Sequence, residues 1–174
     1  MRKQQRKLRR QKIPMAKKTE KTNVMRLLDQ AKIDHEELTY DSSVGTNGVD
    51  VALALGQDPD KVFKTLVTTG KSGAHYVFVI PVNQELDLKK AASAVGEKAI
   101  EMLKSKDLLG LTGYIHGGCS PIGMKKFFTT TVHESAKGYD KIMFSAGKIG
   151  YQVKVAPADL EKMIVLTYKD LIVV

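Results

Sequence analysis

This chain has a single cysteine and no apolar run long enough to cross a membrane. One cysteine excludes an internal disulfide framework and a cysteine-rich zinc site. The uncharged stretch 108–124 holds five glycines and a proline, a composition that argues against a membrane helix. We therefore expect a protein without a membrane segment, and the scarcity of cysteine agrees with a reducing, cytoplasmic location.

Recognisable catalytic and metal-binding patterns are also missing. The four histidines, His35, His75, His116 and His133, lack the His-x-x-x-His spacing of a zinc site. There is no Gly-x-Ser-x-Gly nucleophile elbow and no clear carboxylate pair. Cys119 has only His116 nearby in sequence, which favours a structural thiol over a catalytic one. We expect no metal and no cofactor.

The net charge of +9 is confined to one end of the chain. Residues 1–18 hold nine Lys or Arg and no acid, which leaves 19 basic and 19 acidic residues in 19–174. Such a charge block is typically disordered and can bind phosphate without sequence specificity. Another interpretation stays open, because Met15 would make a natural start and residues 1–14 would then be an upstream extension. The folded domain is expected in residues 19–174.

Lys64 stands alone in the uncharged run 62–67, whose β-branched and aromatic residues predict a strand that is at least half buried. Alternation along a strand puts Lys64 on the same face as Val62 and Leu66. An ammonium group on an apolar face is costly unless it reaches water, an anion or carbonyl oxygens. Lys64 is therefore either a strand-edge lysine that reaches solvent or a functional cation.

The segment 112–123 reads Thr-Gly-Tyr-Ile-His-Gly-Gly-Cys-Ser-Pro-Ile-Gly, with four glycines in twelve positions. Glycine lets backbone N–H groups approach a ligand closely. The segment lacks a Gly-Lys-Ser/Thr ending, so it is not a nucleoside-triphosphate loop. From these residues alone, a substrate-binding wall and a set of tight turns required by a sheet are equally open.

Periodicity and turn residues predict alternating helices and strands after residue 20. Helices are expected from a cap at Thr22 to near 32, at 49–55, at 88–95 with Asp87 as its cap and Gly96 past its end, and at 158–163, with a helical turn at 108–111. Strands are expected at 37–40, 62–67, 75–80, 99–102, 127–132, 141–144 and 151–155, and a last one near 164–166 or 171–174. This pattern predicts one mixed α/β domain.

Four segments carry a family resemblance. They are Val-Phe-Lys-Thr-Leu at 62–66, Leu-Asp-Leu-Lys-Lys at 86–90, the glycine-rich segment 112–123, and Ser-Ala-Gly-Lys-Ile-Gly at 145–150. In their order and spacing, across roughly residues 20 to 170, the chain resembles the YbaK family of bacterial Cys-tRNA(Pro) deacylases. These are relatives of the editing domain inserted in many bacterial prolyl-tRNA synthetases. The resemblance implies a largely antiparallel, curved sheet that forms a partial barrel with surrounding helices.

The resemblance also implies a site and an activity. Lys64 would be catalytic, and Tyr40, Gly117, Gly118 and Ser145 would bind the substrate. The implied enzyme is a free-standing deacylase that removes cysteine from mischarged tRNA(Pro), and also from Cys-tRNA(Cys). The thiol of the attached cysteine would attack its own ester carbonyl, and cysteine would leave as a thiolactone. The implied partners are aminoacylated tRNA and prolyl-tRNA synthetase.

Two departures from the family pattern concern the pocket. Residues 46–48 read Thr-Asn-Gly where relatives have an aromatic residue, and Gln152 stands where they have aspartate. Both put the choice of amino acid in question. Two alternatives therefore stay open: a deacylase that removes alanine or another small residue with an activated water, and a non-catalytic tRNA-binding module. Residues 19–174 have zero net charge and a single arginine, Arg26. Both facts argue against a tRNA-binding module.

Overall fold

The structure, a computed structural model, describes residues 20–174. The basic segment 1–18, expected to be disordered, lies outside the described residues. The helices are α2 (Asn23–Gln30), α3 (Gly48–Ala54), α4 (Leu88–Val95), α5 (Ser105–Thr112) and α6 (Pro157–Met163). The strands are β1 (His35–Thr39), β2 (Phe63–Gly70), β3 (His75–Pro81), β4 (Ile100–Met102), β5 (Thr129–His133), β6 (Ile142–Ser145), β7 (Tyr151–Val155) and β8 (Leu166–Lys169).

Local capping residues explain where the helices begin and end. The Thr22 hydroxyl accepts a hydrogen bond from the Met25 N–H and so caps α2. The Asp87 carboxylate caps α4, and Gly96 ends that helix in the left-handed conformation, with φ of +74°. The predicted helix 88–95 and its cap residues are confirmed.

The strands form two sheets. The smaller sheet has the order β1-β7-β6 and is antiparallel throughout. The larger has the order β4-β2-β3-β5-β8, in which β2 pairs antiparallel with β3 and β4, while β5 pairs parallel with β3 and β8. An isolated parallel bridge between Val62 and Met143 joins the sheets just before β2.

The mixed α/β class is confirmed, and four of the six strand pairings are antiparallel. The expected single sheet is replaced by two, and neither closes, so a partial barrel describes the fold only loosely. The helical turn expected at 108–111 is the longer helix α5. The last strand lies at 166–169, so it begins at the end of the first of the two expected ranges.

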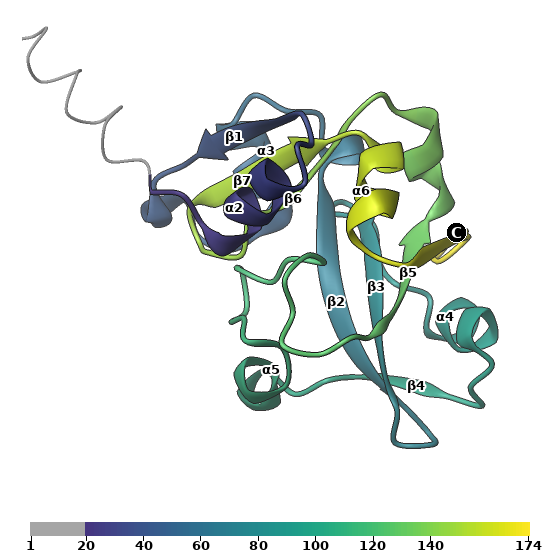
Figure 1. Ribbon diagram of the computed structural model, residues 1–174. Helices are drawn as coiled ribbons and strands as arrows, with labels where there is room; N and C mark the ends of the chain where they lie inside the picture. Colours follow the sequence, from purple (N-terminus) through teal and green to yellow (C-terminus); the bar gives the residue numbers. More distant parts are fainter. Residues whose placement is uncertain (1–19) are drawn as a thin grey trace, which may run out of the picture.

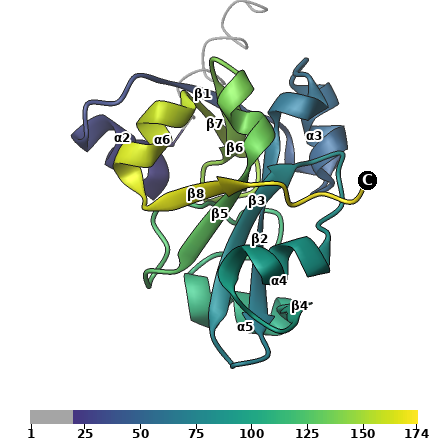
Figure 2. The same ribbon diagram turned by 90° about the vertical axis from the view of Figure 1, so that its right-hand side faces the viewer.

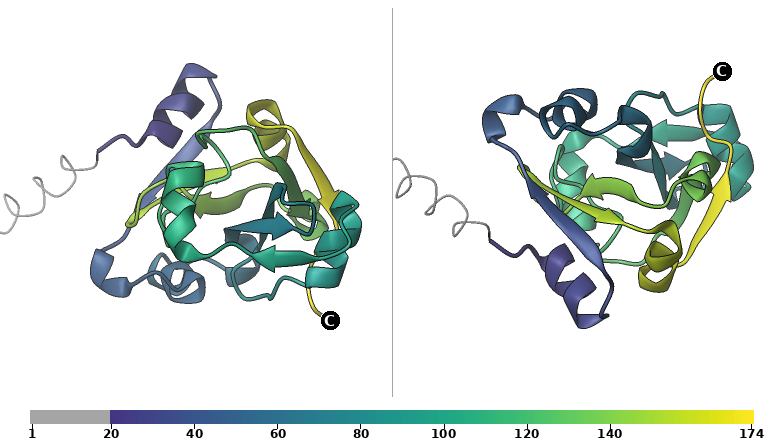
Figure 3. Two further views of the ribbon diagram at one scale, coloured as in Figure 1. Left: turned by 90° about the horizontal axis from the view of Figure 1, so that it is seen from below. Right: turned by 90° about the horizontal axis from the view of Figure 1, so that it is seen from above.

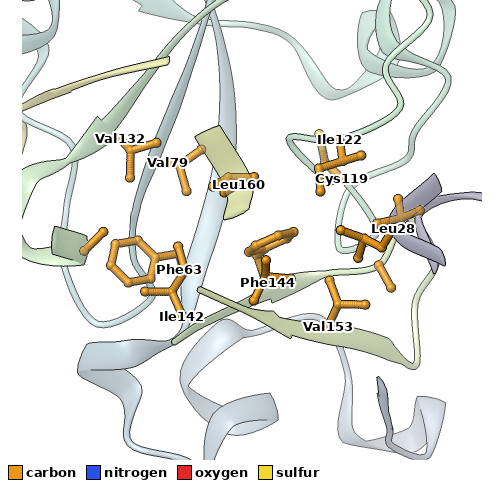
Figure 4. Close-up of a cluster of buried hydrophobic side chains, with 14 of the residues drawn as sticks. Leu28, Phe63, Val79, Cys119, Ile122, Val132, Ile142, Phe144, Val153 and Leu160 are labelled. Carbon is orange, nitrogen blue, oxygen red and sulfur yellow. The ribbon is translucent and has the colours of Figure 1, made fainter. Parts of the chain in front are cut away.

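The main core lies between the two sheets and is closed by α2 and α6. Figure 4 shows Phe63, Val79 and Val132 of the larger sheet beside Ile142 and Phe144 of the smaller one. Leu160 of α6, Leu28 of α2 and two residues of the glycine-rich segment, Cys119 and Ile122, complete this cluster (Figure 4). The larger sheet and the glycine-rich segment are thereby fixed against the smaller sheet.

The helices lie on different sides of the sheets. α5 and α4 lie on opposite sides of the β2–β3 hairpin, as Figures 1 and 3 show from different directions. Figure 2 shows α2 and α6 on one side of the molecule and α3 on the other. In residues 20–174 no helix is both long and apolar enough to span a membrane.

Candidate active site

A pocket of about 150 Å³ lies where the beginning of β2 meets the smaller sheet. Residues 62–66, the segment that carries Lys64, form one wall. The segment between β1 and α3 contributes Thr46 and Gly48, and Val51 of α3 continues that wall. Opposite residues come from α5 and the glycine-rich segment, so segments far apart in the sequence enclose one space.

Lys64 is half-buried in this pocket. Burial lowers the pKa of its ammonium, and the negative charge of Glu85 offsets this in part. Within residues 20–174 Lys64 makes neither an ion pair nor a hydrogen bond. A desolvated cation without a protein partner can stabilise negative charge that develops on a bound substrate.

Three of the four predicted substrate-binding residues line the pocket with Lys64: Tyr40, Gly117 and Ser145. Ser145 is buried, and its hydroxyl oxygen accepts a hydrogen bond from the Gly147 N–H at 3.2 Å. Tyr40 follows β1, and its N–H donates to the Gly150 carbonyl at 2.9 Å.

Gly118, the fourth predicted residue, is not among the lining residues. Its Cα side packs against the backbone of Lys148 and Ile149, where an added Cβ would lie 3.2 Å from the Ile149 nitrogen. The structure therefore shows a packing role for Gly118, and substrate contact by its backbone stays a prediction.

Gly117 is required by both conformation and space. Its φ is +86°, which disfavours any side chain. An added Cβ would also lie 2.4 Å from Thr46 Cγ2, a distance that real contacts do not reach. The glycine-rich segment and the segment before α3 therefore touch at this point and close the pocket between them.

The glycine-rich segment is held in shape at two places. The Lys125 N–H donates to the Thr112 carbonyl at 3.0 Å and closes the base of the loop. Across the loop, the Tyr114 hydroxyl donates to the Ile122 carbonyl, and burial raises the pKa of Tyr114 to about 12. Sequence analysis did not single out Tyr114, although it belongs to the family motif, because a clamp across a loop is visible only in the fold.

Cys119 lines the pocket, but its thiol belongs to the apolar core. Burial raises its pKa to about 12, so the thiolate is scarce near neutral pH. No acid or base of the described chain bonds to the thiol. This environment supports the structural interpretation of Cys119.

Two buried oxygens of the pocket have no hydrogen-bond partner within residues 20–174: Thr65 Oγ1 and Gln152 Oε1. Buried polar atoms without partners are uncommon, and each carries an energetic cost. A substrate with N–H or O–H groups, or a water molecule, could satisfy them. The sequence did not indicate Thr65 as a site residue, because Lys64 was the only residue of its strand that stood out by charge.

The departures from the family pattern take separate roles in the fold. Thr46, Gly48 and Gln152 line the pocket. Asn47 instead caps α3, because its side-chain oxygen accepts hydrogen bonds from the N–H groups of Val49 and Asp50. The composition of the pocket is therefore altered by Thr46, Gly48 and Gln152 and not by Asn47.

Within residues 20–174 one group of side chains has metal-ligand spacing: Asp29, His35 and Glu37, whose donor atoms lie within 4.8 Å. Lys21 Nζ lies 2.9 Å from Asp29 Oδ2 and 2.7 Å from Glu37 Oε2, so a protein cation already neutralises these carboxylates. None of these residues lines the pocket. The expected absence of a metal stays a prediction.

Comparisons with known proteins agree with this geometry. A family model described as the aminoacyl-tRNA editing domain matches residues 43–163. Over 146 residues the chain is 51% identical to EbsC of Enterococcus faecalis, named as a candidate Cys-tRNA(Pro)/Cys-tRNA(Cys) deacylase, with 82% of this chain and 89% of EbsC covered.

A proline–tRNA ligase of Shouchella clausii is 31% identical over 124 residues, which are 70% of this chain but only 21% of the ligase. A crystal structure described as a proposed trans-editing enzyme for prolyl-tRNA synthetase superposes with a TM-score of 0.75 at 24% identity, covering 87% of this chain and 95% of that one. The latter likeness concerns the fold. Together with the family match over residues 43–163, these relationships show that the chain belongs to the aminoacyl-tRNA editing domain family.

Proposed function

We propose that this protein is a free-standing deacylase that removes cysteine from mischarged tRNA(Pro), and also acts on Cys-tRNA(Cys). The observation that carries the proposal is the half-buried Lys64 ammonium, without an ionic partner in the described chain, in a small pocket of an editing-domain fold. The name of EbsC, which matches most of this chain, supports the choice of cysteine.

The proposed reaction uses the substrate's own thiol. The cysteinyl sulfur, as thiolate, attacks the carbonyl carbon of its ester and forms a C–S bond and a tetrahedral oxyanion. That oxyanion collapses, the bond between the carbonyl carbon and the ribose oxygen breaks, and the ribose oxygen takes a proton. The products are a cyclic cysteine thiolactone and tRNA with a free terminal hydroxyl, so no oxidant or second substrate is needed.

The pocket's own groups suit this route because they do not supply a competing nucleophile. The thiol of Cys119 is held protonated by burial, with a pKa near 12. Lys64 would stabilise the oxyanion, and backbone N–H groups of the glycine-rich segment would assist it. Tyr40 and Ser145 would orient the aminoacyl group. Orientation of an intramolecular attack can lower a barrier by roughly 7–11 kcal/mol.

A second candidate is hydrolysis of Ala-tRNA(Pro) or another small aminoacyl ester. The side chains of Thr65 and Gln152 favour it, because both residues line the pocket and each has an oxygen without a hydrogen-bond partner in the described chain that a water molecule could satisfy. That mechanism requires no substrate thiol and releases the free amino acid. The two candidates therefore differ in both substrate range and first product.

The proposed partners are aminoacylated tRNA and prolyl-tRNA synthetase. Because residues 19–174 carry no net charge, tRNA has little general electrostatic attraction to the folded domain. A synthetase that has just released the mischarged tRNA would raise the local substrate concentration. This association would be checked by measuring deacylation with and without the synthetase at low tRNA concentration.

The purified protein should be assayed with Cys-, Ser-, Ala- and Pro-tRNA(Pro). Ser-tRNA provides the matched control, because it replaces sulfur by oxygen, a far poorer nucleophile near neutral pH. We expect rapid loss of cysteine only, with the thiolactone as the first product by trapping and mass spectrometry. Comparable rates for the Cys, Ser and Ala esters, with free amino acid as the initial product, would instead establish hydrolysis.

A further inference from the structure

The two segments that enclose the pocket have opposite charge. Residues 41–60 contain four aspartates and no Lys or Arg, whereas residues 104–126 contain four lysines and one aspartate. The four aspartates of the first segment and the four lysines of the second are all exposed. We call them the acidic rim (Asp41, Asp50, Asp58 and Asp60) and the basic rim (Lys104, Lys106, Lys125 and Lys126).

The segments that carry the two rims both line the pocket, although none of the eight charged side chains does. The first segment lines it with Thr46, Gly48 and Val51, and the second with Leu108, His116, Gly117 and Cys119. The segments meet where Gly117 faces Thr46. The pocket is therefore lined by one aspartate-rich and one lysine-rich segment, which a protruding polyanion would distinguish by their charge.

Three lysines of the basic rim lie at the two ends of α5, and Lys126 follows the third of them in the sequence. Lys104 precedes the helix and Lys106 lies in its first turn, while the Lys125 N–H bonds to the Thr112 carbonyl at the other end. The aliphatic part of Lys125 lies beside Gly113, which caps that end. An eight-residue helix is about 12 Å long, so these lysines border one short element.

No protein anion neutralises these lysines within the described part of the chain. Ion pairs in residues 20–174 involve other lysines, such as Lys21, Lys90 and Lys162. Lys61, the first basic residue after the acidic rim, lies over the Tyr139 ring, 5.5 Å from its centroid. The basic rim is thus charge available to a ligand.

An exposed aromatic ring extends the basic rim. Phe127 follows Lys126 directly, and the residue is 73% exposed. Lys125, Lys126 and Phe127 line a groove of about 510 Å³ whose opposite wall is formed by residues 161–165. Aromatic rings beside lysines form the usual binding surface for single-stranded nucleic acid, because bases stack on the ring while phosphates meet the cations.

We propose that the tRNA leaves the pocket over the basic rim, with phosphates of its 3′ end and acceptor arm against these four lysines and a base on Phe127. This inference rests on the proposed function, because it requires an aminoacyl end in the pocket. The acidic rim repels the same phosphates and so gives the tRNA a single direction of approach. A folded domain with zero net charge thereby binds a polyanion through the separation of its charges.

Binding of uncharged tRNA(Pro) by the full chain tests this without requiring catalysis. In the quadruple variant, each lysine of the basic rim is replaced by alanine. We expect at least about tenfold weaker binding at low salt and a slope of log K against log salt that is shallower by about 1 for each phosphate that no longer meets a lysine. Asp50→Asn on the acidic rim should strengthen binding severalfold.

The double variant Lys89→Ala, Lys98→Ala provides the matched control. Both lysines are exposed and belong to α4 and the segment after it, on the other side of the β2–β3 hairpin from α5 (Figure 1). Their loss should leave both affinity and salt slope close to wild type. Phe127→Ala should weaken binding without changing the salt slope, because a stacking contact releases no counterion.

Catalysis gives a second readout. The ratio of kcat/KM for Cys-tRNA to kcat/KM for the cysteinyl ester of adenosine should fall in the quadruple variant, because only the tRNA reaches the rim. Equal affinity and slope in the quadruple and control variants would overturn the proposal while leaving the proposed function standing. The proposal would also be overturned if the quadruple variant lost binding to the synthetase but kept its affinity for tRNA, because the basic rim would then be a protein interface. A wild-type protein that binds tRNA over the rim but deacylates nothing would instead overturn the proposed function.

Discussion

The two segments that meet at the pocket, residues 41–60 and the glycine-rich segment, hold their backbones in different ways. In the segment 41–60, side chains hold the backbone: Asp41, Asn47 and Asp58 each accept hydrogen bonds from N–H groups at the beginning of a helical turn. In the glycine-rich segment, backbone groups and the Tyr114 hydroxyl bridge the loop, and the hydroxyl oxygens of Thr112 and Ser120 accept hydrogen bonds from nearby N–H groups. Three of the four aspartates of the acidic rim thus accept hydrogen bonds within the fold, whereas the lysines of the basic rim have no side-chain partner in the described chain.

This difference separates recognition from chemistry. The wall formed by residues 62–66 carries Lys64, the only Lys or Arg among the residues of the described chain that line the pocket. The basic rim lies outside and concerns only the attached nucleic acid. Variants of residues 62–66 should therefore change kcat. Variants of the glycine-rich segment should change how this wall of the pocket is covered, and variants of the hydrophobic core should change the stability of the fold.

The sharpest test of the wall formed by residues 62–66 is Lys64→Ala. Removing an oxyanion-stabilising group is expected to lower kcat by roughly 10²–10³, measured with Cys-tRNA(Pro) in single-turnover assays. Circular dichroism and thermal melts should show an intact fold with an unchanged or higher melting temperature, because a desolvated ammonium is removed. A folded variant with a near-wild-type rate would assign Lys64 a structural role.

The pKa of Lys64 gives this test a pH dependence. Burial holds the pKa below its ordinary value of 10.5, so the catalytic cation is lost as pH rises through that lowered pKa. Arginine keeps its charge over this range. The rate of Lys64→Arg, though reduced by altered geometry, should therefore persist to higher pH than that of wild type, after subtraction of uncatalysed ester hydrolysis. Identical alkaline limbs would show that another group titrates.

Elements with local signals could be predicted from the sequence. Thr22, Asp87 and Gly96 mark helix ends through contacts within a few residues, and the helices they mark are present. Lys64 could be singled out because its strand neighbours are uncharged. The parallel pairing of β5 with β3 and β8 depends on contacts between distant segments, so local patterns could not reveal it.

The arrangement of the charged segments at the pocket was likewise not predictable from local sequence patterns. The charges of residues 19–174 sum to zero in the sequence, and only the fold shows that the aspartate-rich segment 41–60 and the lysine-rich segment 104–126 both contribute residues to the pocket lining. Gly117 and Gly118 are neighbours with the same residue type, yet one lines the pocket and the other packs on residues 148–149. No pattern in the sequence distinguishes the two glycines.

Gly117→Ala tests the contact between the two sides and is expected to have the next largest effect. The new methyl group would collide with Thr46 and displace the glycine-rich segment, and a displacement of this kind can cost roughly 10–100-fold in kcat/KM. Gly73→Ala is the matched control, because Gly73 has a similar φ of +92° and nothing within 4 Å of an added Cβ.

Both substitutions force alanine into a left-handed conformation, so both should destabilise the fold by about 1–2 kcal/mol in urea titrations. Only Gly117→Ala should also lower activity, and Thr46→Gly in the same chain should restore part of it by removing the colliding atoms. Equal activities of the Gly117 and Gly73 variants would mean that the two sides do not meet during the reaction.

Tyr114→Phe loosens the glycine-rich segment without changing its shape. The Ile122 carbonyl loses its donor, which is expected to cost about 1–3 kcal/mol in the free energy of unfolding. Activity should fall only severalfold. Tyr168→Phe is the control, because the Tyr168 hydroxyl is buried without a partner in the described chain and its removal should be neutral or stabilising. Equal losses of stability in the two variants would show that the clamp is not formed in solution.

Cys119→Ser should have the smallest effect on activity, although Cys119 lies in the same segment as Gly117. The thiol packs in the core with a pKa raised to about 12, and the proposed nucleophile belongs to the substrate. The rate should stay within about twofold of wild type, since the scarce thiolate contributes nothing. The free energy of unfolding should fall by about 1–3 kcal/mol, because serine places a hydroxyl in an apolar site. The variant Cys119→Ala would separate the cost of this polar group from the cost of reduced side-chain volume. A loss of several orders of magnitude in a stably folded Cys119→Ser variant would contradict the substrate-thiol mechanism and place covalent catalysis on the glycine-rich side of the pocket.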